Sequence, residues 1–194
     1  MHMSYETIIN GIDYGPLAAL IGTWEGDQGL DTAPEPTGDI KEPYFETITF
    51  EAGGDLSNAK EQTLVIVPYL QIVSRKSTGV VFHHQVGYWS WDPKTGVIMQ
   101  SLSIPRGFAL LAGGQYPLQS KYAGEIALEV RAELGDPDWG IVQSPFMRDN
   151  AKTTAFTHKL SVNGDSLSYS ESTMLEIYGK TFDHTDANEL KRVK

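Results

Sequence analysis

The sequence contains no cysteine among its 194 residues. Disulfide bonds, zinc–thiolate sites, iron–sulfur clusters and thiol nucleophiles are therefore excluded. A chain without cysteine suits a reducing compartment. Its first ten residues show no basic stretch followed by an apolar run, so we expect a cytoplasmic protein without a secretory signal. No apolar segment approaches the roughly 20 residues that a membrane-spanning helix requires.

Basic residues are also scarce. The chain has 15 Lys and Arg against 25 Asp and Glu, which gives a formal net charge of -10 at pH 7. Nucleic acids and anionic membrane surfaces reward clustered positive charge, so we expect neither as a partner. A small anionic ligand remains compatible, because one local arginine can hold a carboxylate. The expected partner is a small molecule, with a homodimer as a further possibility.

Familiar catalytic motifs are absent from the sequence. It has no Gly-x-Ser-x-Gly elbow and no His-Glu-x-x-His pair. The segment 22–26 looks like a phosphate turn but lacks the Lys-Ser/Thr ending that cradles phosphate. Glu125 and Glu129 alternate with apolar residues, which is typical of a solvated strand face.

Apolar residues make up 40% of the chain, enough for a sizeable core in one domain over residues 1–194, with 1–14 as an N-terminal extension. Pro16 suits the start of a short helix, and Leu17, Leu20 and Ile21 then share one of its faces. A helix this short needs a larger surface on which to rest.

Strand and turn signals dominate the remainder. About nine strand candidates follow without the alternation of strands and helices that a parallel sheet requires, so the fold class is all-β, a sandwich or a barrel. Several long strands and a helical turn that could plug one end favour a barrel around a ligand cavity. Residues 29–43 contain three prolines and predict a long loop, Pro68 implies an edge or a bulge, and residues 137–150 predict an irregular insertion.

Without cysteine, histidine is the natural ligand for a transition metal or haem iron. His83 and His84 are adjacent on a predicted strand, so at most one of them faces the interior. His158 lies on the apolar side of its strand and is expected to be a partly buried structural residue. His184 follows a strand where the chain turns back, and could point into a barrel mouth. On spacing alone a structural role is the more common one for each of them.

Four sequence features together resemble the nitrobindin family. Residues 20–26 are similar to its Gly-x-Trp-x-Gly motif, which follows a short helix and opens the first strand. Residues 82–89 are similar to a strand in which a Met-His pair precedes Gly-Tyr-Trp, and residues 98–101 to the next hairpin strand with its pocket glutamine. Met174 and His184 have the spacing of the family's pocket methionine and proximal histidine.

The resemblance implies a closed antiparallel β-barrel of about ten strands, similar to lipocalins and fatty-acid-binding proteins, with haem b near one open end. His184 would be the axial iron ligand. Met174, Phe82, His83 and Gln100 would contact the cofactor. Activities known in the family are nitric oxide binding and isomerisation of peroxynitrite to nitrate, so peroxynitrite isomerase is the enzyme activity that the resemblance implies.

The sequence departs from the family pattern in several places. Phe82 replaces the pocket methionine, and residues 106–150 are longer than expected. A slip of one residue in the strand before His184 would reverse its faces, so that Thr173 or Leu175 faces the cavity in place of Met174.

Haem propionates need cationic partners at the rim, and the candidates are Arg106, Arg148 and Lys180. Two other readings of the sequence stay open. The barrel could be a non-enzymatic carrier of a lipophilic small molecule in which His184 is structural, or a filled scaffold without a ligand.

Overall fold

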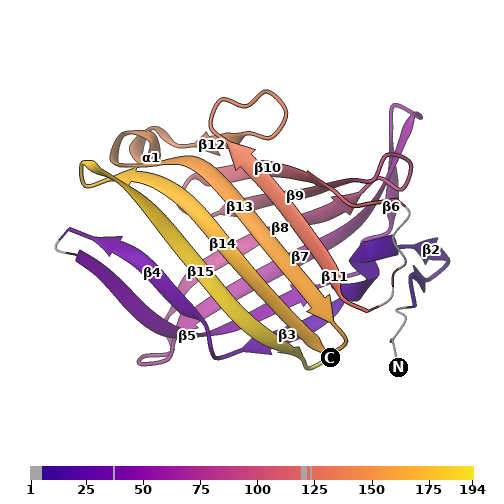
Figure 1. Cartoon of the computed structure of the whole chain (residues 1–194), viewed down its shortest axis with the longest axis horizontal. Helices are drawn as coiled ribbons and strands as arrows, with labels where there is room; N and C mark the ends of the chain where they lie inside the picture. Colours follow the sequence, from indigo (N-terminus) through magenta and orange to yellow (C-terminus); the bar gives the residue numbers. More distant parts are fainter. Residues whose placement is uncertain (1–5, 37, 119–121, 123) are drawn as a thin grey trace.

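Most of the chain forms antiparallel strands, as its alternating pattern predicts (Figure 1). The computed structural model describes residues 6–36, 38–118, 122 and 124–194. The strands are β1 (Ile8–Ile9), β2 (Ile12–Asp13), β3 (Gly22–Gly26), β4 (Leu30–Glu35), β5 (Gly38–Phe50), β6 (Asp55–Asn58), β7 (Gln62–Arg75), β8 (Val81–Trp91), β9 (Val97–Ile104), β10 (Phe108–Gln115), β11 (Ile126–Glu133), β12 (Ile141–Gln143), β13 (Ala151–Asn163), β14 (Ser166–Ile177) and β15 (Lys180–Arg192). A 3-10 helix, η1 (Gly15–Ala19), and a short α-helix, α1 (Pro145–Asn150), complete the elements.

Ten of these strands close into a barrel, which confirms the fold class expected from the sequence. Around the barrel the order is β3, β5, β7, β8, β9, β10, β11, β13, β14 and β15, and β15 pairs back with β3. Closure gives each of these strands two neighbours and so removes exposed sheet edges. The strands β4, β6 and β12 extend the wall beside β5, β7 and β10.

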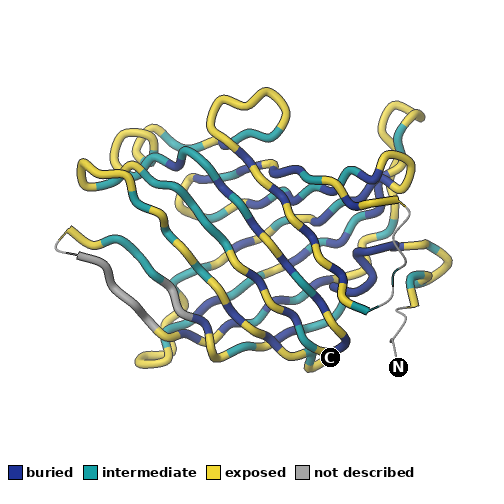
Figure 2. The backbone as a smooth tube through the Cα atoms, in the orientation of Figure 1, coloured by how far each residue is buried: buried dark blue, intermediate teal, exposed yellow. Residues whose placement is uncertain are grey.

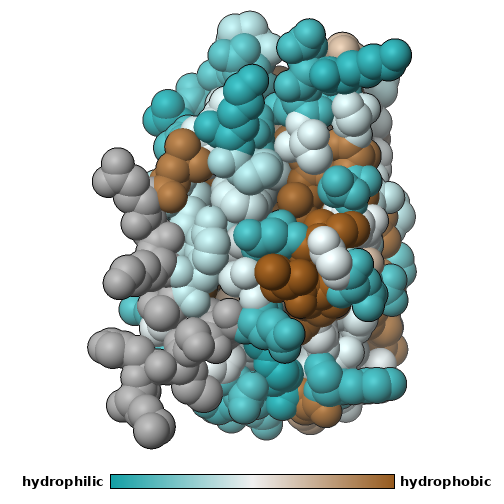
Figure 3. All heavy atoms as spheres, turned by 90° about the vertical axis from the view of Figure 1, so that its right-hand side faces the viewer, coloured by the Kyte–Doolittle hydropathy of each residue, from teal (hydrophilic) through white to brown (hydrophobic). Residues whose placement is uncertain are grey.

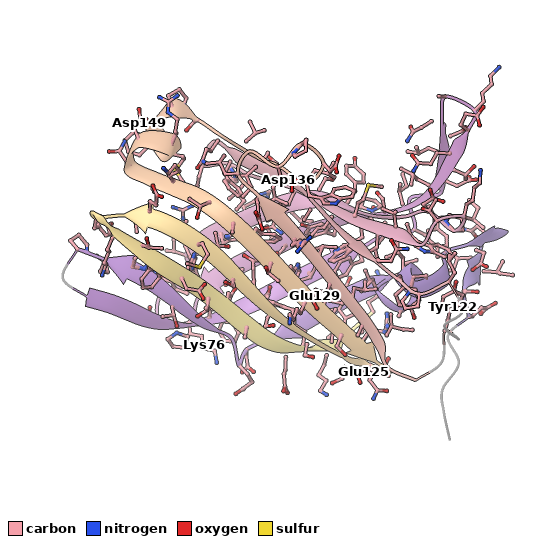
Figure 4. All side chains as sticks on the ribbon, turned by 45° about the horizontal axis from the view of Figure 1, so that its top comes forward. Lys76, Tyr122, Glu125, Glu129, Asp136 and Asp149 are labelled. Carbon is pink, nitrogen blue, oxygen red and sulfur yellow. The ribbon has the colours of Figure 1, made fainter. Side chains whose placement is uncertain are left out.

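Buried and exposed residues alternate along the strands (Figure 2), because successive side chains of a strand point to opposite faces. On β11, Ile126 and Leu128 are buried while Glu129 is exposed. Glu129 lies opposite Lys159 on β13, with Oε1 and Nζ 3.6 Å apart. Glu125 and Glu129, labelled in Figure 4, therefore lie on a solvated face, as predicted.

The predicted N-terminal helical turn closes one end of the barrel. Leu17 and Leu20 are fully buried in the core, and Pro16 lies in the first turn of η1. Gly15 has a φ of +51°, and a Cβ atom there would lie 2.3 Å from the Trp91 ring, so this close approach requires glycine. Figure 3 shows this closed end, where apolar side chains gather between hydrophilic ones. Among the described residues, no helix is long and apolar enough to cross a membrane.

The Gly-x-Trp-x-Gly motif ties this plug to the barrel wall. Trp24 on β3 is completely buried, and its Nε1 donates to the Leu20 carbonyl at 2.7 Å. The guanidinium of Arg192 on β15 lies 4.1 Å from the centre of the Trp24 ring and donates to the Ala19 carbonyl at 3.0 Å. The motif therefore has a structural role: it connects the 3-10 helix to strands β3 and β15 at the closed end, far from the opposite mouth.

The predicted loop over residues 29–43 is wrong, because this segment forms the hairpin of β4 and β5. Pro34 pairs with Asp39, and Pro43 pairs with Leu30. Among the described residues, the ladder pairing of β4 with β15 is limited to Thr32 and Thr185, so β4 has the edge character that tolerates proline.

Two further sequence expectations concern proline-rich segments. Pro68 lies where the neighbour of β7 changes from β5 to β6, which is the irregular position that its missing N–H predicts. The predicted irregular insertion at residues 137–150 instead contains β12 and α1. Ser144 starts α1 by accepting a hydrogen bond from the Met147 amide.

Candidate functional site

A layer of polar side chains crosses the barrel interior between the closed end and the mouth. Along β7 the inward side chains are Val65 and Val67 near the closed end, then Tyr69 and Gln71, and finally the buried Val73 and Arg75 at the mouth. Other strands contribute buried polar groups to the interior, namely Glu46, Gln85, Gln100, His158 and Asn188. Buried polar groups need hydrogen-bond partners, so this layer has to form a connected network.

Glu46 on β5 is one centre of this network. Its carboxylate accepts hydrogen bonds from Gln71 Nε2 at 2.6 Å, Asn188 Nδ2 at 2.6 Å and the Tyr169 hydroxyl at 3.0 Å. Burial raises the pKa of Glu46 to about 7, because desolvation outweighs the hydrogen bonds that favour its charged form.

Tyr44 links two opposite parts of the wall. Its hydroxyl donates to Oδ1 of Asp186 on β15 at 2.5 Å, and its ring meets Phe82 of β8 edge-on at 6.4 Å between centroids. The Tyr169 hydroxyl also lies 3.1 Å from the other oxygen of Asp186, so its single proton is shared between Glu46 and Asp186. Burial, together with the charges of Asp186 and Glu46, raises the pKa of Tyr44, which therefore stays a hydrogen-bond donor.

A second carboxyl group lies beside Asp186. Glu171 on β14 is the cross-strand partner of Asp186. Burial raises the pKa of Glu171 to about 8, and the charge of Asp186 acts in the same direction, while His184 opposes it. Two carboxylates directly opposite each other repel, so the pair keeps one proton near neutral pH.

Tyr69 is the second centre of the network. Its hydroxyl oxygen accepts from Gln85 Nε2 at 2.7 Å and from Gln100 Nε2 at 3.0 Å. The amide oxygen of Gln85 faces His83 Nε2 at 3.3 Å, and that of Gln100 faces His158 Nδ1 at 2.9 Å. The buried Tyr69 hydroxyl thus connects side chains of four strands, β7, β8, β9 and β13, in one hydrogen-bond network.

His158 is buried on the inner face of β13, which agrees with the structural role expected for it. Burial lowers its pKa to about 4, so the imidazole is neutral at pH 7. Gln100 binds its Nδ1, whereas Nε2 has no hydrogen-bond partner within the described part of the chain.

His184 lies on the inner face of β15 toward the mouth. It shares this face with Phe182 and Asp186, and its cross-strand partner is Thr173 on β14. His83 on β8 also belongs to an inward-facing set, with Gln85. Three strands, β3, β5 and β7, separate β15 from β8 by the shorter path around the barrel, so the two histidines lie on opposite walls.

Met174 does not share a face with His184. It pairs with Asp183 and alternates with Thr173, which pairs with His184, so Met174 belongs to the outer face of β14. The structure therefore has the alternative register, in which Thr173 and Leu175 face inward. Sequence spacing alone does not define this parity, because a one-residue slip reverses every side chain.

Phe82 and the two neighbouring histidines lie at a register shift. The pairing of β7 with β8 is irregular between Val73 and Ser74, opposite Phe82. The Phe82 ring contacts Tyr44 and lies near the mouth. His84 is exposed on the outside, while Gln100, the other predicted pocket residue, lies deep in the interior.

Several cationic side chains surround the mouth. Arg106 donates to the Phe82 carbonyl at 3.0 Å, and Lys180 lies 5.8 Å from the centre of the Phe182 ring. Arg148 on α1 pairs with Asp149 at 2.8 Å, and it lines a rim groove of about 850 Å³ together with Lys180.

Arg75 is a rim cation that the sequence reasoning missed. It ends β7 with its guanidinium 5.0 Å from the centre of the Phe82 ring. The two-residue alternation of side chains along β7 could have identified it, because Arg75 lies an even number of residues from Tyr69 and Gln71 and so shares their face. The same alternation would have identified Gln85, which lies two residues after His83 and therefore on the same face of β8.

These residues fit a haem group better than a bare metal ion. Among the described residues, no group of three or more His, Asp or Glu side chains could hold a metal ion. The inward imidazole of His184, close to the mouth, suits an iron that a porphyrin already holds. Phe82, Phe182 and Leu175 offer apolar surface, and the rim cations suit propionates.

Comparison with known proteins agrees with this geometry. The family model for the THAP4-like, heme-binding beta-barrel domain matches residues 13–192. The crystal structure of Rv2717c from M. tuberculosis is similar to this chain, with a TM-score of 0.65 and 24% sequence identity, and the match covers 92% of this chain and 95% of that one. No curated protein matches the chain in sequence. The chain therefore belongs to the nitrobindin family and carries a haem-binding β-barrel domain, with haem as its cofactor.

Proposed function

We propose that the chain holds haem b through His184, binds nitric oxide there, and isomerises peroxynitrite to nitrate. The observation that carries this proposal is the inward position of His184 near the mouth, on the wall opposite His83. When bound, a haem iron with one protein ligand supplies an open coordination position for a diatomic molecule or a peroxy anion.

Isomerisation of peroxynitrite asks little chemistry of the residues at the mouth. Nitrate contains the same atoms and charge as peroxynitrite, so the chain has to bind and orient the anion and does not have to supply electrons. Arg75 and Arg106, which flank Phe82, place positive charge where an anion would enter an otherwise acidic protein. The Phe82 ring, which meets Tyr44 edge-on, would help to keep water away from the bound ligand.

The polar interior counts against the alternative carrier function. Glu46, Glu171 and Asp186 place three carboxyl groups inside the barrel. Near neutral pH Glu171 keeps its proton, but the charge of Asp186 and the ionised fraction of Glu46 would repel a lipophilic anion that reached this depth. A neutral lipophilic molecule would have to cover hydrogen-bonding groups that it cannot satisfy.

The proposed activity can be tested by mixing haem-loaded protein with peroxynitrite in a stopped-flow instrument. Wild type is expected to accelerate the decay of peroxynitrite and to raise the share of nitrate in the products. His84→Ala, which changes an exposed histidine, should retain this activity, and His184→Ala should lose it. An unchanged decay rate in wild type, relative to free haemin, would exclude the isomerase function.

A further inference from the structure

The hydrogen bond between His83 and Gln85 has a defined direction. Gln85 donates its amide N–H to the Tyr69 hydroxyl oxygen at 2.7 Å, so its amide oxygen faces His83 Nε2 at 3.3 Å. An amide oxygen can only accept a hydrogen bond. His83 must therefore carry its proton on Nε2 and donate it to Gln85.

Tyr69 anchors this arrangement from within the core. It is 6% exposed, and its oxygen also accepts the amide N–H of Gln100 at 3.0 Å. Because both amide groups direct N–H to the same oxygen, both amide oxygens point away from it, one to His83 and one to His158. Gln85 is itself only 3% exposed, which leaves its amide little freedom to rotate.

We infer that Tyr69 and Gln85 are positioning residues that hold His83 by its Nε2–H and so prevent it from becoming a second axial ligand. His83 lies on the wall opposite His184, where an imidazole released from Gln85 could turn its Nε2 lone pair toward the iron. The inference rests on the proposed binding of haem through His184. It adds a reason why the second coordination position stays open for a small ligand.

The first test uses the full chain without haem. The ¹⁵N shifts of the His83 ring, measured by NMR, should indicate a single Nε2–H tautomer in wild type. Gln85→Leu and Tyr69→Phe should shift them toward the averaged values of the exposed neighbour His84. Gln115→Leu, which alters an exposed glutamine on another strand, serves as the matched control. Identical His83 shifts in wild type and Gln85→Leu would overturn the positioning role.

The second test uses ferric protein reconstituted with haemin. Electron paramagnetic resonance should show mainly high-spin iron in wild type and a majority of low-spin, bis-histidine iron in Gln85→Leu. The double variant Gln85→Leu/His83→Ala should return to high spin. High-spin iron in Gln85→Leu would overturn the inference even if His184 binds haem. Failure of wild type to bind haemin would instead reject the proposed function, and the haem-free NMR test would still decide the positioning of His83.

Discussion

The Nδ1 atom of His158 lies 2.9 Å from the amide oxygen of Gln100. Since that oxygen only accepts, Nδ1 carries the proton, and the neutral ring presents a bare lone pair at Nε2. This Nε2 is buried and has no hydrogen-bond partner among the described residues. A cavity of about 10 Å³ beside His158 is lined by Tyr69, Gln100, Tyr169 and Glu171, among others.

The first prediction is that one ordered water molecule occupies this cavity. Its volume is close to the minimum for a single water, and its lining offers the polar partners that such a water needs. The water would donate to His158 Nε2 and remove the cost of an unsatisfied buried acceptor. A crystal structure that resolves other buried waters should show it within hydrogen-bond distance of Nε2. An empty cavity there would contradict the tautomer assigned to His158.

The second prediction concerns stability against pH in the haem-free protein. The pKa of Glu171 is raised to about 8, so the folded chain keeps a proton that the unfolded chain releases above pH 4.5. The resulting stabilisation is complete at low pH and is lost as pH rises toward 8. The loss of this proton lowers the free energy of unfolding by at most about 1.4 kcal/mol per pH unit.

Glu171→Gln isolates this effect because the amide cannot ionise. Between pH 6.5 and 8 the free energy of unfolding should fall less steeply in the variant than in wild type. Glu46, with its pKa of about 7, also loses its proton in this window, but it does so in wild type and variant, so only the difference between their slopes reports Glu171. His158 does not contribute there, because its lowered pKa affects stability only between about pH 4 and 6.5. Urea denaturation at several pH values provides the measurement, and parallel slopes for both proteins would show that Glu171 is ionised in the fold.

The third prediction separates the closed end from the mouth. Trp24→Phe removes the buried hydrogen bond to the Leu20 carbonyl and should lower the free energy of unfolding by about 1–3 kcal/mol. Trp91→Phe is the matched control, because Trp91 Nε1 has no hydrogen-bond partner in the described part of the chain. Thermal denaturation should find Trp24→Phe the less stable of the two, while both keep the wild-type haem spectrum. A changed spectrum in Trp24→Phe would show that the motif acts on the site.

The fourth prediction concerns the rim cations. Arg75→Gln should weaken haemin binding about threefold, because an exposed ion pair contributes up to about 1 kcal/mol. Arg148→Gln should have a smaller effect, since Arg148 lies on α1 in the rim groove, whereas Arg75 lies beside Phe82. Haemin titrations at low and high salt give both affinities. Equal affinities for wild type and Arg75→Gln at low salt would exclude Arg75 as a propionate partner.

The fold was accessible from sequence because local and global signals agree. The alternation on β11 and the short helix at Pro16 each match their final environment. The hairpin of β4 and β5 was missed because its prolines lie at an edge, where a missing N–H costs little.

The site was only partly accessible. His184 could be placed at the mouth from its position after a turn, but the face of Met174 depends on the register of β14 with β15. The network around Tyr69 and Glu46 joins residues far apart in sequence, such as Glu46 and Asn188. No local pattern encodes such pairs, which only barrel closure brings together.

Titration of the purified chain with haemin, followed at the Soret band, tests the central claim most directly. Wild type should saturate at one haem per chain, with a band distinct from that of free haemin. His184→Ala should lose this band while keeping its melting temperature within a few degrees, because a half-exposed side chain contributes about 0.5 kcal/mol or less to stability. His158→Ala should lower the melting temperature further and retain the haem band. A wild-type band in His184→Ala, or its loss in His158→Ala alone, would contradict the assignment of His184 as the axial ligand.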